Sequence, residues 1–348
     1  MTEEELIAFF ATLGEPRFRA KQVFPKLHAG VSVSDMTNLS KGLRERLSEI
    51  TLDTLPRVER KLTSKIDGTI KYLFRLHDGE CIESVFMRYK HGNTLCISSQ
   101  VGCLMGCKFC ASTLGGKVRD LLPSELLGQI IAANLDTGER VSNIVMMGIG
   151  EPLDNFDNVI KFLRLVNHPG GLNIGYRHIS LSTCGVVPGI YKLADVDLPI
   201  TLSISLHASN DEKRTSIMPV NKKWHIDELL RACVDYYKKT GRRISFEYTL
   251  ISGKNDTEED ARELAMLLKN AFRGSGAPLH VNLIRVNEVD ETGFKQGTQD
   301  GANRFAATLE ALGVVATVRR KLGTDINAAC GQLRRASAAE SGGEAAVD

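Results

Sequence analysis

From residue 94 onward, short apolar runs alternate with segments of helical periodicity, and no other feature limits the fold as strongly. The runs that we expect to form buried strands are Leu95–Ile97, Ile144–Met147, Ile179–Leu181, Ile200–Ile204, Ile244–Leu250, Val281–Ile284 and Val314–Val318. The helical segments are Ser124–Ala133, Asn158–Val166, Ile226–Tyr237, Glu258–Leu268 and Ala302–Leu312. Repeated strand–helix units predict an α/β protein with a parallel sheet, open or curled into a barrel. In such folds the chemistry lies at the carboxyl ends of the strands.

Residues 1–54 predict a small helical domain. Thr2-Glu3-Glu4-Glu5 is a capping-box pattern that starts the first helix. We expect a second helix to start near Arg17 and to break near Pro25. Ser40 is the expected cap of a third helix.

Residues 55–93 change to a strand pattern. Asp67-Gly68 and Asp78-Gly79 separate runs of β-forming residues, which predicts a hairpin or meander. The tail Ser337–Asp348 is rich in Ala, Gly, Ser and Glu, and this composition predicts disorder.

Four of the eight cysteines lie within fifteen residues, Cys96 to Cys110. The last three have the spacing Cys103-x3-Cys107-x2-Cys110, which allows their thiolates to share one metal centre. Structural zinc takes four ligands, and a four-cysteine iron–sulfur cluster is also fully ligated. Three cysteines would leave one iron of a cluster open to a small molecule. The alternatives are a chance group of buried core cysteines and a zinc ribbon with a fourth ligand from elsewhere.

The net charge is only +2 over 348 residues, so any RNA binding has to come from local basic patches. The candidate patches are Arg17 to Lys26, Arg57 to Lys65, Lys238 to Arg243 and Arg319 to Lys321, each of which could also be an ordinary solvated surface. We find neither a signal peptide nor an apolar run long enough for a membrane span. Eight cysteines without an export signal then predict a reducing, cytoplasmic location.

Polar residues follow several of the predicted strands, on the side of the cysteine loop. They are Gly150 and Glu151, Ser182, Ser205 to His207, and Asn287. Each could be an ordinary tight turn, and His207 alone could be structural. Cys330 lies beyond the last strand among small residues, where it is either a buried cysteine or an accessible nucleophile.

Several motifs occur together in one order. They are Ser98-Ser99-Gln100-Val101-Gly102-Cys103, the cysteine loop, Met146-Met147-Gly148-Ile149-Gly150-Glu151-Pro152-Leu153, Ser205-Leu206-His207-Ala208 and Ala328-Ala329-Cys330-Gly331-Gln332-Leu333. With them the chain resembles, from about Leu6 to Leu333, the RlmN/Cfr family of radical S-adenosylmethionine (SAM) RNA methyltransferases. The chain departs from the pattern of this family at two places. Asn327 stands where Asp is expected, and Ala111-Ser112-Thr113 stands where Ala-Thr-Gly is common.

The resemblance implies a partial (β/α)6 radical-SAM barrel with a small N-terminal helical domain and a β-meander linker. The implied divisions are 1–54, 55–93, 94–322 for the barrel, 323–336 for a loop with the methylated cysteine, and 337–348. A [4Fe–4S] cluster would bind to Cys103, Cys107 and Cys110. The positions matching the family's SAM contacts are Gly150, Glu151, Ser182, Ser205, Leu206, His207 and Asn287.

The resemblance also implies a reaction that uses SAM twice per turnover. Cys330 would carry the methyl group, Cys96 would resolve the adduct by forming a transient disulfide, and Glu83 would accept a proton. The implied product is 2-methyladenine in 23S rRNA and tRNA. A low-potential donor such as flavodoxin or ferredoxin would supply electrons to a monomeric enzyme.

Two other interpretations remain open. A Cfr-like enzyme would methylate C8 of the same rRNA adenine and confer antibiotic resistance. Val101 and Pro152 favour the RlmN-like assignment, whereas Arg285 is a small point for the Cfr-like one. A non-catalytic zinc-ribbon RNA-binding protein is the alternative from another class.

Overall fold

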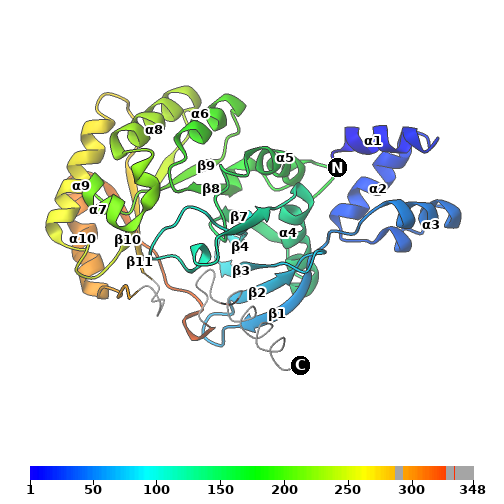
Figure 1. Ribbon diagram of the computed structural model, residues 1–348, viewed down its shortest axis with the longest axis horizontal. Coiled ribbons are helices and arrows are strands. Elements are labelled where there is room, and N and C mark those ends of the chain that lie inside the picture. Colours follow the sequence, from blue (N-terminus) through cyan, green and yellow to red (C-terminus); the bar gives the residue numbers. More distant parts are fainter. Residues whose placement is uncertain (287–292, 327–332, 334–348) are drawn as a thin grey trace.

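The computed structural model describes residues 1–286, 293–326 and 333, and its main feature is a ten-stranded mixed sheet (Figure 1). The strand order is β1-β2-β3-β4-β7-β8-β9-β10-β11-β12. Their bounds are β1 (Arg57–Thr63), β2 (Ile70–Arg75), β3 (Cys81–Tyr89), β4 (Gly92–Cys96), β7 (Val141–Met146), β8 (Ile179–Thr183), β9 (Thr201–Ser205), β10 (Ile244–Leu250), β11 (His280–Arg285) and β12 (Val315–Val318). A separate two-stranded ribbon joins β5 (Gln100–Gly102) to β6 (Lys117–Asp120).

Strands β4 and β7 to β12 are parallel, which confirms the α/β prediction and all seven predicted strands. The helices of this part are α4 (Pro123–Thr137), α5 (Phe156–Asn167), α6 (Val187–Val196), α7 (Asp211–Ile217), α8 (Ile226–Thr240), α9 (Glu258–Ala271) and α10 (Gln299–Ala311). The sequence missed α6, which contains Pro188 and Gly189, and α7, which is short and charged. Short 3-10 turns are Val33–Asp35, Ala111–Thr113, Tyr176–His178, Pro219–Lys222 and Thr324–Ile326.

The N-terminal helices are α1 (Glu3–Thr12), α2 (Phe18–His28) and α3 (Lys41–Ile50), and they lie to one side of the sheet (Figure 1). The capping box at Thr2 and the Ser40 cap are confirmed. The expected break near Pro25 is wrong, because α2 continues through Pro25 to His28. Pro25 has no N–H to donate to the carbonyl oxygen four residues earlier, so α2 passes Pro25 with one backbone hydrogen bond fewer and ends within one turn.

The predicted meander is confirmed, and it is continuous with the parallel sheet. Strands β1 to β4 are antiparallel neighbours, with the two Asp-Gly pairs at the first two turns. Cys96 of β4 is opposite Val85 of β3 on one side and Val145 of β7 on the other. The first parallel strand therefore has partners on both edges.

The strand registers define one polar face of the sheet. Directly opposed residues share a face, and one such row is Lys71, Val85, Cys96, Val145, Ser180 and Thr201. The neighbouring residues Leu95, Ile144, Leu181 and Leu202 point to the other face and are fully buried in the main apolar core. We call the face that carries the row from Lys71 to Thr201 the inner face. No helix in the described ranges is long and apolar enough to cross a membrane.

Candidate active site

The three-cysteine loop is closed at its base by the β5–β6 ribbon, which the sequence did not predict. Cys103 follows β5, and its N–H donates to the carbonyl oxygen of Gly116 at 2.9 Å. Gly102 has φ +80°, and a Cβ there would lie 1.9 Å from the same oxygen. Only glycine allows this approach of two backbone segments.

The environment of the loop disfavours uncompensated thiolates. Cys103 and Cys107 are buried, and burial raises the pKa of Cys103 to about 12 and also raises the pKa of Cys107. The nearby Cys110 adds to both shifts, because neighbouring thiolates repel each other. Thiolates at these positions therefore need a cationic partner inside the loop.

An iron–sulfur cluster fits this donor set, since each of three soft thiolates can bind a different iron. Within residues 1–286, 293–326 and 333, no group of three or more His, Cys, Asp or Glu side chains is placed to hold one ion, the three loop cysteines included. The support for a cluster is therefore the chemistry of the three thiolates.

The turn after β7 is fastened to the segment that precedes the cysteine loop. Ser98 Oγ accepts from the N–H of Ile149 at 3.0 Å and donates to the carbonyl oxygen of Glu83 at 2.6 Å. Gln100 Oε1 accepts from the N–H of Glu151 at 2.9 Å. Gly150 has φ +105°, and a Cβ there would lie 2.6 Å from Cβ of Gln100. These contacts explain why Ser-Ser-Gln and Gly-Ile-Gly-Glu occur together.

Glu151 joins the ends of β7 and β8. Its Oε2 accepts from the N–H of Cys184 at 2.8 Å, and its Oε1 accepts from the N–H of Leu153 at 3.0 Å. Burial raises the pKa of this carboxyl group, and the two hydrogen bonds oppose that change. Each carboxylate oxygen keeps further acceptor capacity for a ligand.

His207 lies at the end of β9 in the left-handed backbone region, with φ +57°. Its Nδ1 accepts from the N–H of Thr249 at 3.0 Å, and burial lowers its pKa to about 3. The ring is therefore neutral and carries its proton on Nε2. The centroids of the His207 ring and of the Phe109 ring, which belongs to the cysteine loop, are 5.1 Å apart in an edge-to-face arrangement.

Ser182 of β8 and Ser205 of β9 lie close together, with their Oγ atoms 3.5 Å apart.

Arg214 of α7 is a buried residue that sequence reasoning missed. Its guanidinium donates to the carbonyl oxygens of Cys184 at 2.6 Å, Leu206 at 3.1 Å and Ser205 at 3.3 Å. It also donates to Asn221 Oδ1 at 2.8 Å. One side chain thus holds the ends of β8 and β9 together. A single arginine in a short charged helix carries no signal of this role.

Glu83 and Cys96 lie on the inner face of neighbouring strands. Cys96 packs with Val85 and Met87 and lies directly opposite Val85 in the strand register. Glu83 is two residues before Val85 in β3, so the two side chains are on the same face. Glu83 forms a buried ion pair with Lys71, with 3.2 Å between Nζ and Oε2. Lys71 was not among the residues that the sequence indicated.

The chain beyond β12 is held against the turn between β1 and β2. The N–H of Gly323 donates to Asp67 Oδ2 at 2.9 Å. Asp325 accepts from Ser64 Oγ at 2.6 Å and from the N–H of Lys65 at 2.8 Å.

Two predicted site residues, Asn287 and Cys330, lie outside the described residues. The expected transient disulfide between Cys96 and Cys330 therefore has no structural test. No disulfide joins any two of the seven cysteines in the described part of the chain.

Comparison with known proteins first defines the class. The family model "Radical SAM superfamily" matches residues 97–265. The crystal structure of a radical SAM methyltransferase from Sphaerobacter thermophilus has a TM-score of 0.89 and 41% identity, covering 95% of this chain and 97% of that one. The fold and the cysteine loop thus define a radical SAM methyltransferase, and this superfamily implies a [4Fe–4S] cluster and SAM.

The comparisons then define the family. The model "Ribosomal RNA large subunit methyltransferase N-terminal domain" matches residues 1–52. The "Probable dual-specificity RNA methyltransferase RlmN" of Alkaliphilus oremlandii is 56% identical over 96% of both chains. That of Clostridium botulinum Eklund 17B is 54% identical over 96% of this chain and 95% of its own. The chain belongs to the RlmN family of radical SAM RNA methyltransferases, as the sequence motifs indicated, with RlmN rather than Cfr among these relatives.

Proposed function

We propose that the protein methylates C2 of adenine in 23S rRNA and in tRNA by a radical mechanism. The observation that carries this proposal is that Glu83 and Cys96 lie on one inner face, next to the segment that leads into the cysteine loop. A ring carbon such as C2 has no nucleophilic lone pair, so polar methyl transfer from SAM does not reach it. The bound cluster and two SAM molecules per turnover supply the methyl group and the 5′-deoxyadenosyl radical.

Apart from Asn287, which is outside the described residues, the residues proposed to hold the cofactors follow or end the parallel strands or belong to the cysteine loop. Cys103, Cys107 and Cys110 would bind the cluster, and the burial of Cys103 and Cys107 would limit the access of water to it. The proposed SAM contacts are Gly150, Glu151, Ser182, Ser205, Leu206, His207 and Asn287. In this set, Glu151 is suited to accept from the SAM ammonium group, and neutral His207 can donate from Nε2.

Three residues would carry the transfer to RNA. The thiolate of Cys330 would take a methyl group and later join it to the adenine ring. Glu83 would accept the proton lost from that ring carbon. The thiolate of Cys96 would then attack the sulfur of Cys330 and break the sulfur–carbon bond. The electron pair of that bond would go to the methylene carbon, which takes up a proton to become the methyl group, so the methylated base is released and a disulfide is left. A low-potential donor such as flavodoxin or ferredoxin would supply the electron for the cleavage of SAM, and a reductant would restore both thiols in the cytoplasm.

The product identifies the reaction. RNA incubated with the anaerobically reconstituted enzyme, SAM and reductant should yield 2-methyladenosine after nuclease digestion and mass spectrometry. 8-Methyladenosine would instead establish the Cfr-like reaction. Cys330→Ala should abolish product while retaining iron and sulfide, whereas Cys107→Ala should lose both iron and product. Catalytic methylation by Cys330→Ala would disprove the two-thiol mechanism.

A further inference from the structure

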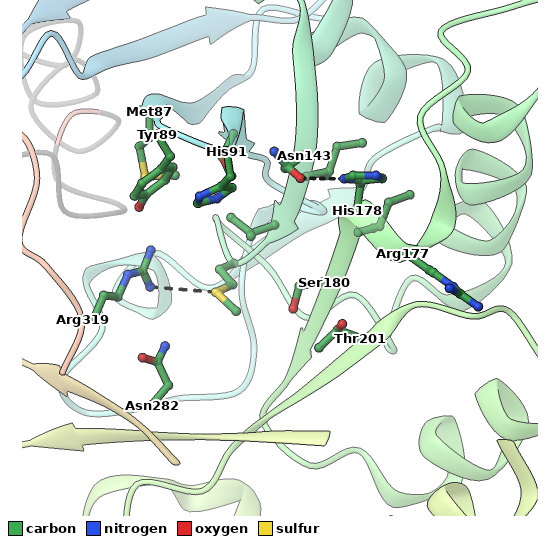
Figure 2. A pocket seen from close by; sticks show the side chains of 15 residues that line it. Met87, Tyr89, His91, Asn143, Arg177, His178, Ser180, Thr201, Asn282 and Arg319 are labelled. Carbon is green, nitrogen blue, oxygen red and sulfur yellow. Dashed lines mark hydrogen bonds between the residues drawn. The ribbon is translucent and has the colours of Figure 1, made fainter. Parts of the chain in front are cut away.

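A cavity of about 360 Å³ opens at the amino ends of β8 and β9 and extends along the inner face to Met147, which follows β7, and Arg319, which follows β12. Ser180 is the second residue of β8, Thr201 is the first residue of β9, and His91 lies in the turn before β4. Figure 2 shows these residues around the cavity, together with Tyr89 and Arg319. None of them belongs to the sites proposed above for the cluster or SAM.

The cavity extends to the cross-strand row that contains Cys96. Thr94 and Val145 line it. Thr94 is two residues before Cys96 in β4, and Val145 is directly opposite Cys96 in β7. The cysteine loop follows β5 beyond the other end of β4. The cavity and the cysteine loop therefore approach Cys96 from opposite ends of the barrel.

The wall of the cavity suits a nucleotide. The rings of Tyr89 and His91 are stacked, with centroids 5.1 Å apart and an angle of 15° between their planes. His91 is exposed, so the outer face of this ring pair is accessible to a base. Aromatic faces of this kind bind unstacked bases with little regard to sequence.

Arg319 adds a cation beside the rings. Its guanidinium contacts Met147 Sδ at 3.9 Å, and no carboxylate within the described ranges forms an ion pair with it. The adjacent Asn282 does bind a carboxylate, because it donates to Glu247 Oε2 at 2.7 Å. The charge of Arg319 acts on Glu247, whose pKa it lowers against the rise caused by burial, but it forms no ion pair with that carboxylate, so the guanidinium can still bind a phosphate group at this edge of the cavity.

We propose that the target adenosine of the RNA reaches Cys96 through this cavity, from the amino ends of the strands. The Tyr89–His91 ring pair stacks on a base of the RNA, and Arg319 binds a neighbouring phosphate. An enzyme that acts on a base carbon must draw that base out of its stack into a pocket. Under the proposed function the cluster and SAM would occupy the carboxyl ends, which leaves the opening at the amino ends of β8 and β9 as the route for the base. This inference rests on the proposed RNA methylation.

Photo-crosslinking locates the base directly. A hairpin RNA with 8-azidoadenosine at the target position is irradiated with the reconstituted wild-type enzyme, and the modified peptide is identified by mass spectrometry. We expect attachment within β3, the following turn or β4. Attachment only to peptides outside the cavity wall would overturn the proposal, and this readout needs no variant to fold.

Steady-state kinetics then assign the contacts. Tyr89→Leu combined with His91→Ala should raise KM for RNA about tenfold or more, whereas Tyr89→Phe, which keeps the ring, should change it little. Arg319→Gln should raise KM and lower the salt slope of RNA binding by about one. Arg262→Gln, on the outer helix α9, is the matched control and should change neither.

The outcomes separate this inference from the proposed function. Iron content and SAM affinity of every variant should equal those of the wild type, since none of the substituted residues is among the proposed cluster ligands or SAM contacts. If the wild type forms methylated RNA and the ring-pair variants keep its KM, the inference is wrong and the function stands. If the wild type forms no methylated adenosine, the proposed function itself fails.

Discussion

Nζ of Lys71 lies 3.2 Å from Oε2 of Glu83, and the two side chains are only 1% and 2% exposed. The pair joins the start of β2 to β3 on the inner face, and Glu83 is two residues from Val85, which lies opposite Cys96. Burying two charges is costly unless each compensates the other. The pair therefore fixes where the carboxylate of Glu83 lies, which is the group proposed to receive the ring proton.

Removing one partner of this pair should be strongly destabilising. Lys71→Met leaves the Glu83 carboxylate buried without its cation, a change that costs about 3–5 kcal/mol. We expect a lower urea midpoint for Lys71→Met, with part of the loss recovered in Lys71→Met/Glu83→Gln. Lys161→Met, which breaks the half-exposed pair with Glu5, is the control and should cost about 1 kcal/mol or less. Equal effects of Lys71→Met and Lys161→Met would show that burial of the pair is unimportant.

Asp325 should control how firmly the chain beyond β12 is held. Asp325→Ala removes the acceptor for Ser64 Oγ and for the N–H of Lys65. Without this acceptor, the amide hydrogen of Lys65 should exchange several-fold faster, on the order of 3-fold or more. Hydrogen exchange followed by mass spectrometry measures this rate. Asp300→Ala, at the exposed start of α10, should leave it unchanged, and protection that survives Asp325→Ala would refute the tether.

Gly150→Ala tests the packing of the turn after β7. The new Cβ would lie 2.6 Å from Gln100 Cβ, and φ +105° is itself unfavourable for alanine. Together these effects should cost about 2–5 kcal/mol and weaken SAM binding. Gly253 also has positive φ, +69°, but an added Cβ there meets nothing within 4 Å. Gly253→Ala should therefore cost only about 1–2 kcal/mol, and calorimetric titration with SAM should separate the two variants.

The N-terminal domain should lose stability in mild acid because of His28. Burial, with a smaller contribution from His168, lowers the pKa of His28 from 6.5 to about 4. The unfolded chain then binds more protons than the folded one between those values. Stability consequently falls as the pH falls from 6.5 toward 4, by at most about 1.4 kcal/mol per pH unit. Urea midpoints from pH 7.5 to 4.5 should fall less steeply for His28→Gln than for the wild type, and His225→Gln should follow the wild type.

Local patterns were sufficient to predict the strands, most helices and the cysteine loop. Each depends on spacing along the chain, and residues such as Cys103 and Cys107 are close in sequence as well as in space. Lys71 is a residue whose role such local patterns did not predict. It alternates with Ile70 and Tyr72, a pattern typical of a strand with one face in water, but its face is turned to the barrel interior.

Arg214 shows the same limit for a helix. Its acceptors belong to Cys184, Ser205 and Leu206, whose carbonyl oxygens come together only when β8 and β9 pair. Backbone acceptors leave no mark on the residue types, so the contact has no sequence signature. Family resemblance likewise indicated Glu83 and Cys96, but it did not indicate the lysine that holds Glu83 in place.

The antiparallel strands β1 to β3 also protect an edge. Strand β4 is hydrogen-bonded to β3 on one side and to β7 on the other. A fragment that began at β4 would present a row of unsatisfied N–H and C=O groups to other chains, a common cause of aggregation. The smallest soluble unit that contains the barrel should therefore begin no later than β1. Deleting the meander would remove three strands and also expose the edge of β4 to pairing with other chains.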